Sequence, residues 1–137
     1  EAVNRLASSN TLDLMALIGS YDEAVSLEAM RRAGYISSPS AVAPLARVLD
    51  TASETSRAAA VAALAQIGSP GAMQVLERGL DDSDRDIRLF VVKACAERQY
   101  RPVLARLERA IKDRLTRDGS SNEKNAFFEA YASCGRD

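Results

Sequence analysis

SRAAAVAALAQIGSPGAMQVLERGL, residues 56–80, aligns without a gap with IRLFVVKACAERQYRPVLARLERAI, residues 87–111, when the chain is shifted by 31 residues. In this alignment Leu76 meets Leu107, and a shift of the same size toward the N-terminus brings Leu76 onto Leu45. A fixed period of this length is typical of a solenoid, because one short repeat cannot bury its apolar face alone and neighbouring repeats stack to form a continuous core.

Each repeat is predicted to contain two helices. In the most regular repeat the first helix begins at Pro39 and ends near Asp50, and the second covers about residues 54–67. Apolar residues recur three and four positions apart in both segments. Gly68 is a typical helix stop, and Pro70 prevents the second helix from continuing. Leu64 and Leu76 should therefore be almost fully buried.

The remaining repeats follow the same pattern with one insertion. Aligning Lys124 with Arg88 requires an offset of 36 residues, so about five residues are inserted in the turn 116–122, which has a loop composition. We expect about four repeats. The apolar spacing recurs over residues 12–18, 24–36, 72–80, 87–95, 103–111 and about 123–133.

Composition excludes several classes of protein. The 137 residues include 47% hydrophobic and 5% aromatic residues and carry a formal net charge of −1, so nothing favours nucleic acid or an anionic membrane as a partner. No apolar run is long enough to span a membrane, and the first residues do not resemble a signal peptide. Cys95 and Cys134 fall on apolar stripes and are predicted to be buried free thiols, which fits a cytoplasmic location.

The segment Arg57–Pro70, RAAAVAALAQIGSP, resembles HEAT repeats, specifically the short HEAT-like repeats first described in phycobilisome lyases. The resemblance covers about residues 10–135. It implies an all-α fold, a right-handed α-solenoid of HEAT-like helix pairs. Ankyrin and tetratricopeptide repeats fit less well. We expect one domain over residues 1–137. We also expect it to be a segment of a longer solenoid, because the sequence starts at Glu1 and no helix follows Gly135.

Residues that carry chemistry are scarce. The chain has no histidine, which removes Ser-His and Cys-His nucleophiles and the commonest metal ligand, and it has no glycine-rich phosphate loop. The acidic cluster at residues 81–84 lacks the glycine of a calcium loop, so helix capping is the favoured interpretation. We expect no catalytic residue, no metal and no cofactor.

Two arginines recur at the start of second helices, Arg57 and Arg88. A cation is disfavoured at that end of a helix, so something must compensate. The resemblance implies a structural ladder in which these arginines pair with turn acids and link adjacent repeats. We expect each arginine to reach an acidic turn residue or a turn carbonyl, within one repeat or across a repeat boundary. The turn acids are Asp50, Asp81 and Asp82. Ser26 and Lys124 replace the arginine in the first and last repeats, so the ladder should weaken at both ends.

In HEAT solenoids the second helices line the concave face. Residues four apart and outside the apolar stripe should be exposed there, and they form either a docking strip for a partner or ordinary surface. We call these candidate partner-binding residues the partner strip. They are Leu27, Arg31, Tyr35, Ala62, Gln66, Leu89, Lys93, Glu97 and Glu129.

The favoured function is a non-catalytic scaffold that binds a protein or peptide through this concave face. The alternatives are a bilin lyase or isomerase, by family analogy alone, and a nucleic-acid-binding HEAT-like protein. Three aromatic residues, Phe127, Phe128 and Tyr131, crowd the last predicted helix. Because adjacent residues project about 100° apart, one of them should lie outside the buried stripe, and weak self-association through this end is expected.

Overall fold

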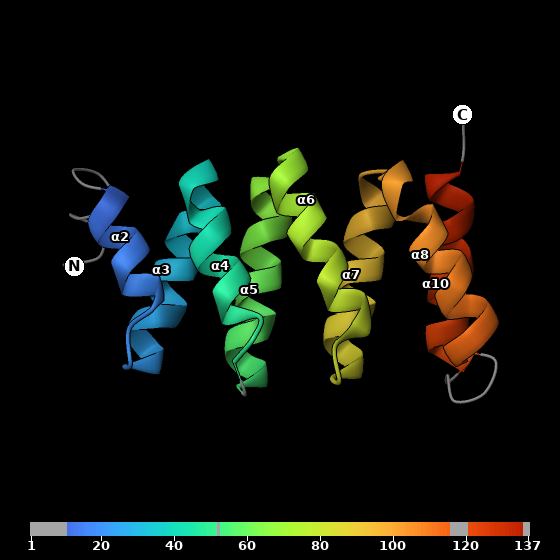
Figure 1. Cartoon of the computed structure of the whole chain (residues 1–137), viewed down its shortest axis with the longest axis horizontal. Helices are drawn as coiled ribbons and strands as arrows, with labels where there is room; N and C mark the ends of the chain where they lie inside the picture. Colours follow the sequence, from blue (N-terminus) through green and yellow to red (C-terminus); the bar gives the residue numbers. More distant parts are fainter. Residues whose placement is uncertain (1–10, 52, 116–120, 136–137) are drawn as a thin grey trace. The chain divides into compact units, whose positions relative to one another are not determined.

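A computed structural model describes residues 11–51, 53–115 and 121–135, and all regular structure in these ranges is helical (Figure 1). Each repeat has a first helix and a second helix joined by a short turn. The first helices are α2, α4, α6 and α8, and the second helices are α3, α5, α7 and α10. In chain order the elements are α2 (Thr11–Ile18), α3 (Glu23–Ile36), η1 (Pro39–Ala41), α4 (Val42–Val48), α5 (Glu54–Ile67), α6 (Pro70–Leu76), η2 (Glu77–Asp81), α7 (Arg85–Glu97), η3 (Arg101–Val103), α8 (Leu104–Arg109), the π-helix η4 (Ala110–Leu115) and α10 (Ser121–Cys134).

Side-chain caps define where the second helices begin. The Asp22 carboxylate accepts hydrogen bonds from the backbone N–H groups of Ala24 and Val25 at the start of α3. Ser53 and Asp84 cap α5 and α7 in the same way. Each cap satisfies N–H groups that the first turn of a helix leaves without partners. Asp22 and Asp84 are therefore engaged in capping, and Asp84 confirms the helix cap that the sequence predicted within residues 81–84.

The ends of three second helices share one backbone conformation. Gly68 follows α5 with a φ of 64°, and Ser37 and Gln99 have φ values of 53° and 51°. These residues lie 31 positions apart, so the left-handed stop recurs at the ends of α3, α5 and α7. Glycine adopts this conformation without strain, whereas serine and glutamine adopt it at a cost.

The chain divides into two compact units, and the first covers residues 1–79. Within it α3 packs against α5, and α4 lies next to α2 and α6 in a separate layer (Figure 1). The contact between α3 and α5 is close because small residues meet. A Cβ added to Gly34 would lie 3.1 Å from the Cα of Ala63. The buried residues of the two helices are Ser26, Ala29, Met30, Ala33 and Gly34 on α3 and Ala60, Val61, Ala63 and Leu64 on α5.

The second unit covers residues 80–137. Here α10 packs against α7, α8 and η4. Phe127 is fully buried, and the Cys134 thiol donates a hydrogen bond to the carbonyl oxygen of Cys95 at 3.3 Å. Both cysteines are free and buried, as predicted.

The sequence predicted the central helices well. The structure confirms the predicted helix at residues 54–67, and Leu64 and Leu76 are both 0% exposed. The last helix is longer than predicted, because it begins at Ser121, inside the expected turn 116–122. The predicted helix at 103–111 is divided among η3, α8 and η4. The predicted loop at 116–120 and the N-terminal residues 1–10 lie outside the described residues.

Candidate functional site

Exposed bulky side chains are concentrated on the second helices. Among the described residues, six large hydrophobic or aromatic side chains are exposed, and only Tyr21 lies in a turn. Proteins use aromatic side chains of this kind as the main contributors to binding energy in interfaces. The other five are Tyr35 and Ile36 on α3, Phe90 on α7, and Phe128 and Tyr131 on α10.

In the first unit the partner strip lies on α3 and α5. Tyr35 is 76% exposed, Arg31 and Gln66 are exposed, and Leu27 and Ala62 are half-buried. Arg31 donates two hydrogen bonds to the Glu28 carboxylate, at 3.0 and 2.6 Å. The Arg31 guanidinium lowers the pKa of Glu28, and burial opposes this shift. The same carboxylate also accepts a hydrogen bond from Arg32 at 2.9 Å, so two guanidinium groups share it. The strip therefore presents a tyrosine ring one helical turn from a cation whose charge is only partly balanced.

In the second unit the partner strip lies on α7 and α10. Lys93, Glu97 and Glu129 are exposed and Leu89 is half-buried. Phe90, the neighbour of Leu89, is 42% exposed, so it also contributes to the surface. This part of the strip mixes both charges with one aromatic ring, and a basic groove for nucleic acid would need more cations than Lys93 supplies.

The predicted ladder is met by the arginines but not by the acids expected to pair with them. Arg57 donates to the carbonyl oxygen of Thr51, in the turn before its helix, at 3.0 Å. The Asp50 carboxylate pairs with Arg78 at 2.6 Å, and that of Asp81 pairs with Arg106 at 2.6 Å. Asp50 and Asp81 therefore pair with other arginines than the ones that open second helices, whereas Arg57 meets the expectation through a turn carbonyl. Each of the two acids lies at the end of one first helix, within reach of the arginine carried by the next first-helix segment of its own unit.

Arg88 has the more elaborate environment. Its guanidinium donates to the carbonyl oxygens of Asp82 at 2.9 Å and Ser83 at 3.2 Å. It also forms two hydrogen bonds with the Glu123 carboxylate, at 2.7 and 3.0 Å. Glu123 is 2% exposed. The bond to Glu123 raises the pKa of Arg88, and desolvation opposes this shift in part. Sequence reasoning missed Glu123 because the insertion places it 35 residues from Arg88, outside the 31-residue period.

The last second helix, α10, buries one side-chain stripe, whereas the other second helices bury two. One stripe of α10, from Glu123 to Cys134, is buried. A second stripe about 100° away contains Lys124, Phe128 and Tyr131. Phe128 is 57% and Tyr131 38% exposed. The equivalent apolar pairs on the preceding second helices are all buried. They are Met30 and Ala33 on α3, Val61 and Leu64 on α5, and Val92 and Cys95 on α7.

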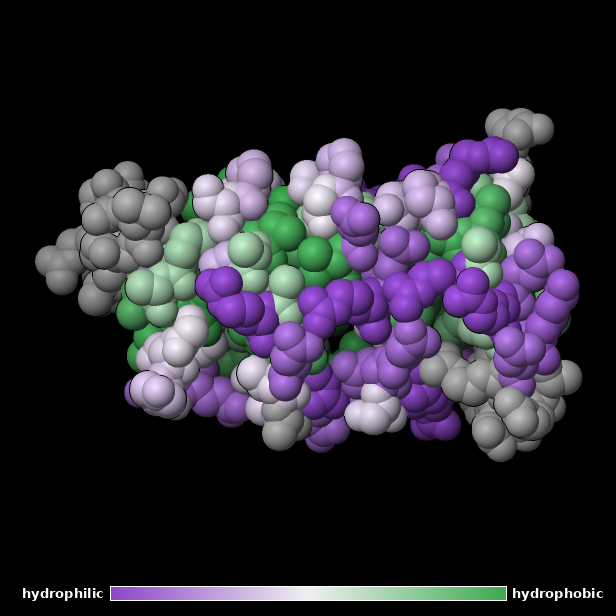
Figure 2. Space-filling view, in the orientation of Figure 1, coloured by the Kyte–Doolittle hydropathy of each residue, from purple (hydrophilic) through white to green (hydrophobic). Residues whose placement is uncertain are grey.

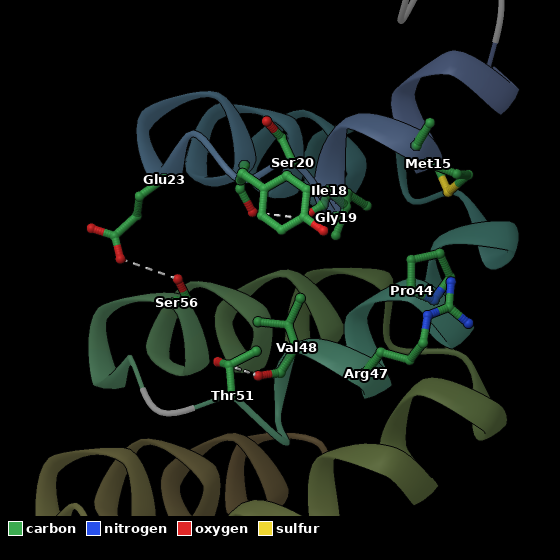
Figure 3. A pocket seen from close by; sticks show the side chains of 13 residues that line it. Met15, Ile18, Gly19, Ser20, Glu23, Pro44, Arg47, Val48, Thr51 and Ser56 are labelled. Atoms are coloured by element: carbon green, nitrogen blue, oxygen red, sulfur yellow. Dashed lines mark hydrogen bonds between the residues drawn. The ribbon is translucent and has the colours of Figure 1, made fainter.

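The first unit also has a pocket between α2 and α4, which we call the outer pocket (Figure 3). Its volume is about 380 Å³. Figure 3 shows Arg47 and Glu23 at opposite ends, and Glu23 accepts hydrogen bonds from the hydroxyls of Ser53 and Ser56. No pattern in the sequence predicts this pocket, because residues from two different repeats line it.

Hydrophilic residues (purple in Figure 2) gather over α8, the helix that carries Arg106 and Arg109. Among the described residues, no group of histidine, cysteine and acidic side chains could hold a metal ion. In the same residues no helix has the length and apolar character needed to cross a bilayer.

Comparison with known proteins yields one family. A sequence profile for HEAT repeats matches residues 11–94, from the start of α2 to the last turn of α7. No curated protein matches the chain.

Proposed function

Because this chain belongs to the HEAT repeat family, whose members are commonly protein-interaction scaffolds, we propose that it is a non-catalytic scaffold for a partner protein or peptide. The partner would bind the exposed surfaces of the second helices. Within each unit the helix pairs offer a surface with few converging polar groups, which suits recognition better than catalysis.

The placement of the exposed aromatic residues is the observation that carries this proposal. Among the described residues, every exposed large hydrophobic side chain on a helix belongs to a second helix. Tyr35 on α3 and Phe90 on α7 are the best candidates for energetically dominant contacts, because aromatic residues are enriched at such positions. The mixed charges around them, such as Arg31 with Glu28 and Lys93 with Glu97, favour a protein surface of mixed charge over a polyanion.

Two finer assignments belong to the same proposal. The short 31-residue period supports placing the repeats in the HEAT-like type first described in phycobilisome lyases. The free, buried thiols of Cys95 and Cys134 support a reducing, cytoplasmic location. Fractionation of cells that produce the protein tests the location, and recovery with membranes or in an oxidising compartment would contradict it.

Site-specific photo-crosslinking tests the binding surface. A photoreactive amino acid replaces Tyr35 or Phe90, and in control variants it replaces Gln74 on α6 or Ala105 on α8, which are exposed on first helices of the same units. Cells are irradiated and crosslinked proteins are identified by mass spectrometry. We expect one protein to be captured from positions 35 and 90 and much less from positions 74 and 105. Equal capture from all four positions would contradict the proposal.

The captured protein then allows a quantitative test. Tyr35→Ala should weaken its affinity about tenfold or more, which corresponds to about 1.4 kcal/mol. Gln74→Ala is the matched control and should leave the affinity unchanged. Titration calorimetry measures both values. An unchanged affinity for Tyr35→Ala would remove α3 from the binding surface.

A further inference from the structure

A smaller cavity in the second unit lies at the same position of the repeat as the outer pocket of the first unit, and comparing the two shows which side chains the outer pocket lacks. This cavity has a volume of about 180 Å³, against about 380 Å³ for the outer pocket. Its six lining residues are Leu80, Asp81, Arg106, Arg109, Ala110 and Asp113. Subtracting 62, twice the 31-residue period, gives six residues that all line the outer pocket: Ile18, Gly19, Pro44, Arg47, Val48 and Thr51.

The two cavities occupy the same place in the repeat but contain different groups. In the second unit an ion pair between Asp81 and Arg106 fills the site. In the first unit glycine replaces the acid at position 19, and proline replaces the cation at position 44. Arg47 remains, and its side chain has no hydrogen bond or ion pair with the residues that the structure describes. One repeat further on, the equivalent Arg78 pairs with Asp50 at 2.6 Å.

The backbone does not require glycine at position 19. A Cβ built there would lie 3.7 Å from its nearest neighbour, the carbonyl oxygen of Ala16, which is an ordinary van der Waals contact. The φ of Gly19 is also outside the left-handed region. An aspartate would therefore fit at this position as it does at positions 50 and 81. The glycine leaves a place for a carboxylate open beside Arg47.

We propose that the outer pocket binds a segment of a partner protein that contains one acidic residue, and that its carboxylate pairs with Arg47 at the position that Asp50 and Asp81 occupy in the other repeats. The apolar side chains of Met15, Ile18 and Val48 line the same pocket, so they would contact an apolar residue next to the acid. Glu23 at the opposite end repels a second carboxylate, so the favoured ligand is a single acidic residue rather than an acidic run.

This site goes beyond the scaffold function proposed above. It lies between the first helices α2 and α4, whereas the scaffold proposal concerns the exposed surfaces of the second helices. Loss of binding in the pocket would leave crosslinking from position 35 unchanged, so the two proposals can fail separately.

Nuclear magnetic resonance titration of the full chain tests the pocket. The probe is acetyl-Leu-Asp-amide, in which the aspartate side chain carries the only charge, and acetyl-Leu-Asn-amide is the neutral control. We expect the aspartate probe to shift the Arg47 side-chain signal and the amide signals of Gly19, Ser20 and Thr51. The dissociation constant should be on the order of 1 mM or weaker, with the leucine side chain supplying most of the binding energy and the exposed ion pair the smaller part. The asparagine probe should bind at least several-fold more weakly. Equal shifts from both probes would overturn the proposal.

Three variants and one salt identify the cause of the shifts. Arg47→Gln should abolish them, and Gly19→Asp should abolish them by supplying the carboxylate from within the chain. Arg78→Gln is the matched control and should retain them, because Asp50 already occupies Arg78. Retention of the shifts in Arg47→Gln, or their loss in Arg78→Gln, would overturn the proposal. If sodium acetate binds as tightly as the aspartate probe, the pocket recognises any carboxylate, and the proposal of a peptide ligand is wrong.

Discussion

At the scale of single residues, Arg88 and Glu123 form an ion pair that solvent barely reaches, with side-chain exposures of 17% and 3%. Removing one partner of such a pair leaves an uncompensated charge in a poorly solvated place. Arg88→Met should therefore destabilise the second unit by about 2–5 kcal/mol. Urea unfolding followed by circular dichroism measures the change.

The double variant Arg88→Met with Glu123→Met provides the control for this prediction. It removes both charges and fills the site with apolar atoms, so it should recover a large part of the lost stability. A double variant that is less stable than Arg88→Met alone would show that the two side chains do not act as a pair.

The Cys134 thiol provides a prediction about pH. Burial raises its pKa, and a hydrogen bond from the Tyr100 backbone opposes the shift only in part. Below the pKa of an unfolded thiol, about 8.5, both states hold the proton and the contribution of Cys134 to stability is fully present. As the pH rises above this value the unfolded chain loses the proton first, so stability falls.

Comparison with Cys134→Ala isolates this effect. The difference in the free energy of unfolding between the natural chain and the variant should shrink from pH 7 to pH 10, in favour of the variant. A difference that does not change over this range would show that the thiol is not buried in solution.

Ion pairs show why residue-scale features were harder to predict than helices. The period placed Asp50 and Asp81 at equivalent positions, but it could not specify which guanidinium reaches them. Asp50 pairs with Arg78, and Asp81 pairs with Arg106. The two arginines do not occupy equivalent positions of the repeat, because Arg106 lies about one helical turn before the equivalent of Arg78. A long side chain can reach a carboxylate from either of two successive helical turns. The choice therefore depends on packing that a single sequence does not encode locally.

At the scale of elements, the contact between α3 and α5 depends on Gly34. A Cβ at this position would overlap the Oε1 atom of Gln66, which can move, and would lie 3.1 Å from the Cα of Ala63, which cannot move without shifting the helix. Gly34→Ala should therefore destabilise the first unit by about 1–3 kcal/mol, although alanine is the better helix former.

Gly71 is the matched control for this prediction. It is also a helical glycine, in α6, but nothing lies within 4 Å of an added Cβ. Gly71→Ala should stabilise the chain by about 0.4–1 kcal/mol through the unfolded state. Thermal unfolding of both variants shows whether each substitution lowers or raises the stability. A stabilising effect of Gly34→Ala would contradict the close approach of the two helices.

Elements were predictable because their signals are local. Ser53 caps α5, and Gly68 ends it, at the boundaries that the residue types indicated. The start of α10 was predicted two residues late because Ser121 and Asn122, which resemble loop residues, form its first turn. The outer pocket had no local signal, since Gly19 becomes informative only when it is compared with Asp50 and Asp81 in space.

At the scale of the whole molecule, the second stripe of α10 is the feature most relevant to assembly. Its apolar pair, Phe128 and Tyr131, occupies positions that the other second helices bury. We propose that a second copy covers it, with the two α10 helices antiparallel and Phe128 of each opposite Tyr131 of the other. In this register Lys124, which has no ion pair among the described residues, would lie near the negative C-terminal end of the partner helix.

Sedimentation equilibrium over a range of concentrations tests this association. Two aromatic pairs form a small interface, so we expect a monomer at low micromolar concentration and dimers toward the millimolar range. Phe128→Glu should abolish the dimers. Tyr35→Glu, which introduces the same charge at another exposed aromatic position, should not. A chain that remains monomeric at millimolar concentration would contradict the proposal.

The left-handed stop that follows α3, α5 and α7 has a consequence for the order in which the chain opens. Only one of its three occurrences is a glycine, at position 68, whereas Ser37 and Gln99 adopt the same φ at a cost of about 1 kcal/mol each. In an array of coupled repeats, such differences in intrinsic stability add to the interfaces between neighbours. The amides of α5 should therefore exchange with deuterium more slowly than those of α3 or α7. Gln99→Gly should slow exchange in α7 toward the rate of α5.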